Sequence, residues 1–215
     1  MNAIVIDVDD TLISTDRRRH AAWCKVLGRE VSFQDVESSS SGEILKKYVG
    51  SDKEIWRKFW MLVLCVDESG VDLLELDEPI AHAVGIIKKW NRKSKLIYLT
   101  ARTENMRQHT LYELGKFGYP IQDTELKMFT LDDWMNYSST SSVVKTRSIL
   151  FAEILDRYNV IRVIDDYPAF FMAYRDHPVP DRIGLLREKR FSREQYLSNG
   201  ATRVIKGWDE LTIEQ

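Results

Sequence analysis

The first residues that could do chemistry follow an apolar run at the N-terminus. Residues 3–6 read AIVI, and the carboxylates Asp7, Asp9 and Asp10 come directly after them in IVIDVDDTLIST. Because alternate side chains of an extended chain share one face, Asp7 and Asp9 should point the same way. Two carboxylates held that close need a neighbouring cation. We expect Asp10 to point away into solvent and the Thr11 hydroxyl to brace the turn.

The ends of later predicted strands carry groups that could complete such a site. Thr100 ends the run KLIYLT, and Asp165–Asp166 end VIRVIDD. Ligands of an open parallel sheet bind at the carboxyl ends of its strands, so these groups would converge if the strands are neighbours. Lys145 begins the helix before the last of these strands and could reach the same crevice. Clustered oxygen ligands of this kind are typical of a Mg²⁺ site.

A carboxylate pair, a hydroxyl, a lysine and metal-binding acids form a set suited to phosphoryl transfer. Asp7 could attack phosphorus and carry it as an aspartyl-phosphate. A protonated Asp9 could give its proton to the leaving oxygen and later accept one from water. The metal and Lys145 would neutralise charge on the phosphoryl oxygens.

The predicted elements would bring these groups to one edge of a sheet. From residue 77 onward, short β-branched runs alternate with segments of helical period, which is typical of a doubly wound parallel α/β sheet. The predicted strands are 3–8, 95–100, 126–131, 160–165, 182–187 and 202–207. The predicted helices of this part are 79–91, 103–117 and 143–158.

Residues 14–76 break the alternation, because they read as helices only. We therefore predict a core of residues 1–13 and 77–215, with residues 14–76 inserted as a small α-helical cap. Arg17–Arg19 could bind a second phosphate or a nucleic-acid end, or form a solvated helix face. Trp56, Phe59, Trp60 and Leu64 recur at helical spacing, which suits a base-stacking platform or packing inside the cap.

The order of these motifs resembles the haloacid dehalogenase (HAD) superfamily. The four matching features are DVDDT at 7–11, the strand ending in Thr100, Lys145, and the pair Asp165–Asp166. The resemblance implies a Rossmann-like core with a cap between the first two motifs. It implies that Asp7 is the nucleophile and Asp9 the general acid/base, a second Asp that the phosphatases of the superfamily keep. Thr100 and Lys145 would hold the phosphoryl group.

The same resemblance implies how Mg²⁺ would be held. The nucleophile Asp7, the backbone carbonyl of Asp9 and an acid of the fourth motif would be its ligands. Asp166 aligns with the metal-binding position of related GD motifs, so we favour it as the ligand. Asp165 would then orient Lys145 or a metal-bound water.

A narrower resemblance concerns the stretches LTAR, VVKTRSILFAEIL and YNVIRVIDDYP. They are similar to the phosphatase half of polynucleotide kinase-phosphatases, which implies that Arg102 contacts a substrate phosphate. We also expect Thr11 and Ala101 to bind the substrate. Those domains do not usually carry a helical insert here, and capped relatives more often act on small metabolites. The expected substrate is therefore a nucleotide, a nucleic-acid 3′-phosphate end or another small phosphate ester.

Two other classes of protein remain as alternatives. A regulatory phospho-acceptor domain of the response-regulator type also uses strand-end acids, a hydroxyl, a lysine and Mg²⁺. There the acid pair comes first in the chain, whereas here Thr100 and Lys145 lie between the two acid clusters. The other alternative is a HAD-fold binding protein without activity, which the intact motif set disfavours.

Composition sets limits on the partners. The chain has 215 residues, a net charge of −2 and no clustering of its Lys and Arg residues, so we expect no extended contact with duplex nucleic acid. No apolar run suits a membrane span, the four histidines are dispersed without zinc-like spacing, and a strand begins at once in place of a signal peptide. With only two cysteines, we expect a cytoplasmic protein with no membrane partner. The sequence leaves the oligomeric state open.

Overall fold

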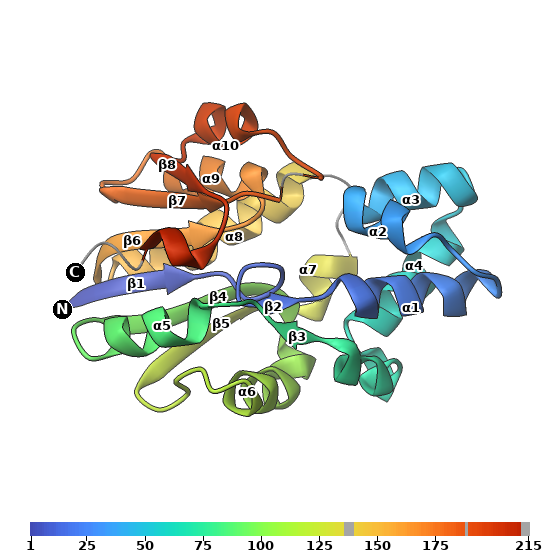
Figure 1. Ribbon diagram of the computed structural model, residues 1–215, viewed down its shortest axis with the longest axis horizontal. Helices are drawn as coiled ribbons and strands as arrows, with labels where there is room; N and C mark the ends of the chain where they lie inside the picture. The colour runs from blue at the N-terminus through green and yellow to red at the C-terminus, as the bar shows by residue number, and fades with distance from the viewer. Residues whose placement is uncertain (136–139, 188, 212–215) are drawn as a thin grey trace.

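The centre of the molecule is a six-stranded parallel sheet with the order β5-β4-β1-β6-β7-β8 (Figure 1). This computed structural model describes residues 1–135, 140–187 and 189–211. The strands are β1 (Asn2–Ile6), β4 (Lys95–Thr103), β5 (Thr124–Phe129), β6 (Asn159–Asp165), β7 (Asp181–Leu185) and β8 (Arg203–Ile205). The predicted α/β class with a doubly wound parallel sheet is confirmed. Strand β1 lies between β4 and β6, so the strands that carry or directly precede Asp7, Thr100 and Asp165 are neighbours, as the predicted site requires.

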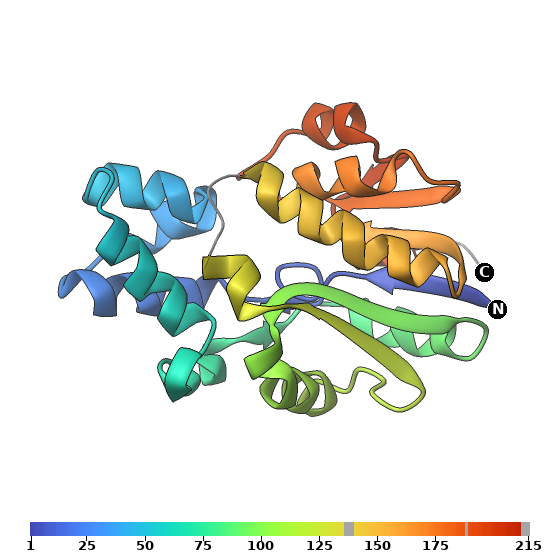
Figure 2. The same ribbon diagram turned by 180° about the vertical axis from the view of Figure 1, so that it is seen from behind.

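Helices cover both faces of this sheet, because alternate strand residues are apolar on both sides. In β1, Ile4 and Ile6 belong to one apolar cluster, and Ala3 and Val5 belong to the other. The first face is covered by α5 (Ala83–Asn91), α6 (Arg107–Lys116) and η5 (Trp208–Leu211). The second is covered by α8 (Thr140–Leu155), α9 (Phe171–Tyr174) and α10 (Arg193–Asn199) (Figure 2). Between these lie η3 (Glu104–Met106), α7 (Leu131–Met135) and η4 (Pro168–Phe170).

The predicted insert is helical. It contains α1 (Asp16–Leu27), α2 (Phe33–Ser38), α3 (Ser41–Tyr48), α4 (Lys53–Val63), η1 (Val66–Glu68) and η2 (Val71–Leu76). A short antiparallel pair that the sequence did not suggest, β2 (Ile13–Ser14) with β3 (Glu78–Pro79), joins its two ends. Its apolar cluster includes Trp23 stacked on Phe59, with ring centroids 4.0 Å apart. Trp56 packs against this cluster as well, so these aromatic residues support packing rather than a free stacking platform.

The insert lies beyond the carboxyl ends of the strands (Figure 1). Trp60 of α4 packs on Trp134 of α7, with ring centroids 4.4 Å apart. Nearby, the Asn105 side-chain amide donates to the Leu64 carbonyl at 2.8 Å. These contacts join the insert to the elements that follow β4 and β5. In the described part of the chain, no helix is long and apolar enough to cross a membrane.

Candidate active site

Three buried carboxyl groups meet where β1 and β6 end. One oxygen each of Asp7, Asp165 and Asp166 lies within 4.8 Å of the others. The backbone sets this meeting, since β1 and β6 pair in register up to Ile6 and Ile164 and the acids follow directly. Burial raises the pKa of Asp7 well above its usual value, and the nearby Asp165 carboxylate raises it further. Burial likewise raises the pKa of Asp166, and Asp10 and Asp7 add to that effect.

Asp165 and Asp166 have different surroundings. Asp165 accepts hydrogen bonds from Arg147 at 2.6 Å, from the Tyr174 hydroxyl at 2.9 Å and from the Tyr167 backbone at 3.0 Å. The Asp166 carboxylate accepts none from the described residues. Asp165 therefore holds Arg147 and Tyr174 in place, whereas the oxygens of Asp166 are available to a cation. This difference is compatible with the prediction that Asp166 is the metal ligand and Asp165 an orienting residue.

The basic group beside Asp7 is Arg147, and the prediction of Lys145 is corrected. Arg147 Nη2 donates to Asp7 Oδ1 at 3.0 Å, and its Nε donates to the Tyr174 hydroxyl at 2.6 Å. Its guanidinium also lies 4.5 Å from the Phe170 ring centroid. Lys145 is exposed, because two residues along α8 turn the side chain to roughly the opposite side.

A signal for Arg147 was present in the sequence. Phe151 and Ile154 follow it at spacings of four and seven, so Arg147 lies on the apolar stripe of α8. All three side chains are buried. A basic residue on the buried face of a helix needs an acidic partner, which distinguishes it from the solvated Lys145.

Two hydroxyl groups complete this part of the site. Thr11 is buried and donates to Asp7 Oδ2 at 3.1 Å, so it braces the carboxylate as well as the turn. Thr100 is buried on β4, and its Oγ1 accepts the Arg102 backbone N–H at 3.1 Å, which leaves its own proton free to donate. Ala101 follows it, and its carbonyl accepts the Trp134 indole N–H at 2.6 Å.

Arg102 does not point to a substrate, and the predicted phosphate contact is corrected. Its side chain is 1% exposed. Its Nε and Nη2 donate to Asp9 Oδ1 at 2.9 and 2.7 Å. Its Nη1 forms a short contact with Glu113 and donates to Thr110 at 3.3 Å. Arg102 therefore supports Asp9 from inside the core.

The surroundings of Asp9 also include Asp77 and Arg18. Arg102 Nη2 lies 3.4 Å from Asp77, and Arg18 Nη2 donates to Asp9 Oδ1 at 3.1 Å. With Glu113, three carboxyl groups face two guanidinium groups, so full ionisation would leave a buried negative charge unbalanced. Burial raises the pKa of Asp77 to about 8, although Arg18 and Arg102 act in the opposite direction.

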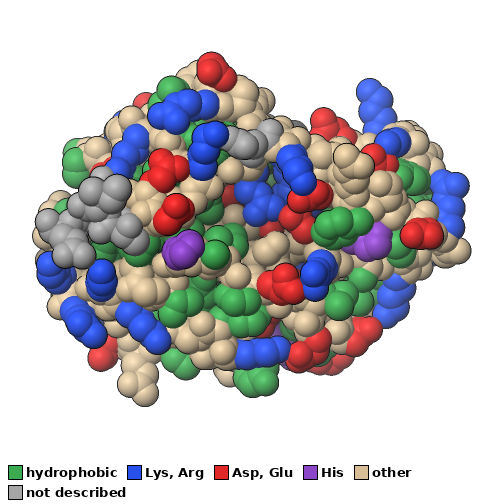
Figure 3. Space-filling view, viewed as in Figure 1, with side chains coloured by type: hydrophobic (Ala, Val, Ile, Leu, Met, Phe, Trp, Pro, Cys, Tyr) green, Lys and Arg blue, Asp and Glu red, His purple; other side chains and the backbone are tan. Residues whose placement is uncertain are grey.

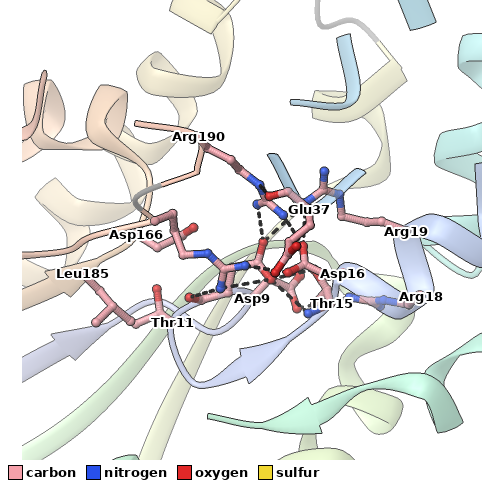
Figure 4. A network of polar contacts seen from close by, with 12 residues as sticks. Asp9, Thr11, Thr15, Asp16, Arg18, Arg19, Glu37, Asp166, Leu185 and Arg190 are labelled. Carbon is pink, nitrogen blue, oxygen red and sulfur yellow. Dashed lines mark hydrogen bonds and ion pairs between the residues drawn. The ribbon is translucent and has the colours of Figure 1, made fainter. Parts of the chain in front are cut away.

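Asp10 is buried, and the expectation that it is solvated is wrong. Its left-handed backbone, with φ of 59°, turns its carboxylate toward the insert. Oδ1 accepts from the Thr15 backbone at 2.9 Å, and Oδ2 accepts from Arg190 Nη1 at 2.7 Å. Figure 4 labels Thr15 and Arg190 within this network of polar contacts. Burial alone would raise the pKa of Asp10, but Arg187, Arg190 and Arg19 together hold it far below its usual value.

Asp10 belongs to a cluster of five charged residues, the Asp10 cluster, which comprises Asp10, Asp16, Arg19, Arg187 and Arg190. Arg187 Nη2 donates to Asp16 Oδ2 at 2.7 Å, and Arg19 donates to the carbonyls of Val36 and Ser39 at 3.1 and 3.0 Å. Basic and acidic side chains accordingly gather where the insert meets the sheet (Figure 3). Arg18 and Arg19 are therefore buried in ion pairs, and only Arg17 of the three forms a solvated face.

Replacing Asp10 by Asn should lower the free energy of unfolding by about 3 kcal/mol at pH 7, because largely buried arginines lose their partner. The folded protein holds the pKa of Asp10 below its unfolded value of about 3.9, so its contribution is complete above that value and is lost as the pH falls. Urea unfolding from pH 7 down to pH 3 should show the variant and the wild type converging. Exposed Asp156→Asn is the control, and a difference independent of pH would contradict this role.

The comparisons with known proteins agree on the fold. No protein-family model and no curated protein sequence matches this chain. A HAD-like family hydrolase from Streptococcus pneumoniae superposes with a TM-score of 0.68 at 12% identity, covering 98% of this chain and 96% of that one. A predicted phosphatase from Clostridium acetobutylicum gives 0.68 at 15% identity, covering 99% and 97%.

A third similar structure contains a metal. A candidate HAD hydrolase from Bacillus subtilis, described as bound to magnesium and as showing interdomain movement, gives a TM-score of 0.59 at 13% identity and covers 99% of this chain and 97% of that one. Identities this low establish the fold alone, so the resemblance to the HAD superfamily is confirmed at the level of the fold. The narrower resemblance to polynucleotide kinase-phosphatases is not confirmed by these structures.

Proposed function

We propose that this protein is a Mg²⁺-dependent phosphomonoesterase that works through an aspartyl-phosphate on Asp7. The observation that carries the proposal is the buried guanidinium beside that carboxylate. Arg147 uses Nη2 and Nε on Asp7, Asp165 and Tyr174, whereas its buried Nη1 has no hydrogen-bond partner among the described residues. An unpaired charged donor inside a protein is costly unless a ligand uses it, and a phosphoryl oxygen is a suitable acceptor.

The residues divide the reaction between them. A carboxylate oxygen of Asp7 attacks phosphorus while the bond from phosphorus to the ester oxygen breaks. Asp9 gives its proton to that leaving oxygen, and it later takes a proton from the water that hydrolyses the aspartyl-phosphate. Arg147 and the Thr100 hydroxyl stabilise the charge on the other phosphoryl oxygens. The water's oxygen leaves with the phosphate, so Asp7 and Asp9 return to their starting states.

The residues present fit a divalent cation. Buried carboxylates at strand ends repel one another, and Asp166 offers oxygens that no described side chain uses. Mg²⁺ prefers such oxygen ligands, and Asp7, Asp166 and the Asp9 carbonyl would hold it. When bound, it would offset the carboxylate charge and that of the phosphoryl group.

For the substrate we propose a small phosphate ester, with nucleotides first among the candidates. The insert lies over the carboxyl edge of the sheet, which suits a substrate that can be enclosed. Arg102 offers no support for a nucleic-acid end, because its donors are used inside the core. Turnover of 3′-phosphorylated oligonucleotides, compared with that of nucleotides, distinguishes a nucleic-acid end from a small substrate.

The direct test is phosphate release from p-nitrophenyl phosphate, nucleoside monophosphates, sugar phosphates and 3′-phosphorylated oligonucleotides. We expect turnover with Mg²⁺, its loss after chelation and its recovery when Mg²⁺ is restored. Full activity in the presence of the chelator would contradict the metal requirement. A stable phosphoprotein without turnover would instead support a phospho-acceptor module, and no reaction with any substrate would support an inactive binding protein.

A further inference from the structure

One oxygen of Asp9 is held by two arginines that come from different parts of the molecule. Asp9 Oδ1 accepts three N–H groups: two from Arg102 at 2.9 and 2.7 Å, and one from Arg18 at 3.1 Å. Oδ2 accepts no hydrogen bond from the described residues, and the Asp9 side chain is 33% exposed. The carboxylate is thus anchored by one oxygen while the other remains open to the site.

Arg102 and Arg18 differ in what carries them. Arg102 belongs to β4 of the sheet, whereas Arg18 belongs to α1 of the insert. Arg18 also donates to the carbonyl of Val63, at the end of α4, at 3.4 Å. Asp9 therefore accepts hydrogen bonds from both the sheet and the insert. The hydrogen bond from Arg18 depends on the position of the insert relative to the sheet.

The position of Arg18 is costly unless its ion pairs form. Its side chain is 1% exposed, and its Nε lies 3.3 Å from Asp77 Oδ1 without hydrogen-bond geometry, so neither atom has a hydrogen bond there. A buried guanidinium with an unsatisfied donor contributes little to stability on its own. By contrast, a carboxylate fixed by charged hydrogen bonds on one oxygen presents its other oxygen in a defined direction.

We propose that Arg18 of the helical insert is a positioning residue for Asp9, so that the open oxygen faces the leaving group only while the insert is docked on the sheet. The proposal rests on the phosphomonoesterase function proposed above. Displacing the insert would withdraw one guanidinium and leave Asp9 held by Arg102 alone. Protonation of the leaving group is then coupled to closure of the site around the substrate.

This role predicts an effect that depends on the leaving group. A nitrophenolate leaves with little help, whereas an alkoxide needs the proton that Asp9 supplies, and general acid catalysis contributes typically 10²–10⁴-fold, as a rough range. The quantity to compare is kcat/KM, because it covers the steps up to departure of the leaving group. Hydrolysis of the aspartyl-phosphate, which is common to all substrates, does not enter it.

The experiment compares Arg18→Gln with wild type on p-nitrophenyl phosphate and on glycerol phosphate, with Mg²⁺ present. We expect kcat/KM to fall about 30-fold or more for the alkyl ester and less than about threefold for the nitrophenyl ester. Arg17→Gln is the matched control, since Arg17 is the neighbouring residue of α1 and is 62% exposed in a pair with Glu78. It should change neither value by more than about twofold.

A second variant guards against loss of folding. Arg18→Gln/Asp77→Asn also replaces the buried carboxyl group beside Arg18 by an amide of the same shape, so no Asp77 carboxyl is left facing the lost guanidinium. It should show the same dependence on the leaving group if Arg18→Gln is unstable. Equal losses on both esters in both variants, or no loss on either ester, would overturn the role of Arg18 alone. A wild-type protein that hydrolyses neither ester would overturn the proposed function itself, and this role with it.

Discussion

The Asp7→Asn variant should release phosphate at least about 10³-fold more slowly than wild type, because the amide cannot form the acyl-phosphate bond. The geometry supports this expectation, since Arg147 donates to Oδ1 of Asp7 and Thr11 donates to Oδ2, and these hydrogen bonds fix the orientation of the carboxylate. A continuous phosphate-release assay with p-nitrophenyl phosphate and Mg²⁺ measures the loss. Incubation of wild type with substrate, followed by rapid acid quenching, should trap phosphate on Asp7 and none on the variant.

The loss should not come from unfolding. Burial and the Asp165 carboxylate raise the pKa of Asp7, so removing this charge relieves repulsion in the metal-free protein. Thermal unfolding with a chelator present should therefore show the variant at least as stable as wild type. Asp156→Asn makes the same chemical change at an exposed residue and should keep full activity. Metal-dependent turnover retained by Asp7→Asn would rule out a covalent route through this residue.

The part of the site fixed by the backbone could be predicted from the sequence. Asp7, Thr100 and Asp165 each lie near the end of an apolar strand, and parallel pairing of β1 with β4 and β6 brings those ends together. Strand type and strand end are local properties, which apolar runs and the residues after them reveal. The order of the motifs then indicated the fold.

The part fixed by side-chain partners could not be predicted in the same way. Asp10 looked solvated because its partners, Arg187 and Arg190, come from the other end of the chain. Arg102 looked like a phosphate ligand because Glu113 and Asp9 could not be placed beside it in advance. Buried ion pairs between residues far apart in the chain leave no local pattern in the sequence. Each such pair uses side-chain groups that would otherwise be free to contact solvent or substrate.

Substitution of Arg147, the basic residue beside Asp7, should also lower activity strongly, whereas substitution of Lys145 should not. Arg147→Lys should lower kcat/KM by about 10²-fold or more, because an ammonium has one nitrogen and cannot hold Asp7 and Asp165 while a second nitrogen contacts the phosphoryl group. The guanidinium uses Nη2 for both carboxylates, and its Nη1 has no hydrogen-bond partner among the described residues, which leaves Nη1 for the proposed phosphoryl contact. Lysine keeps the charge, so Asp165 retains a partner and the fold should survive, whereas Arg147→Ala would leave buried carboxylates unpaired.

Lys145→Ala is the matched control, because it removes the neighbouring cation from the exposed side of α8. Both substitutions lie on α8, two residues apart, and Lys145→Ala also removes a charge that Arg147→Lys keeps. A larger loss at Arg147 therefore comes from its direct contacts and not from a change in net charge. We expect Lys145→Ala to stay within about twofold of wild type in kcat/KM, as an exposed charge should. The reverse result, a large loss at Lys145 and none at Arg147, would mean that α8 turns on substrate binding and that the lysine replaces the arginine. Comparable losses in both would indicate that the two cations share the phosphoryl group.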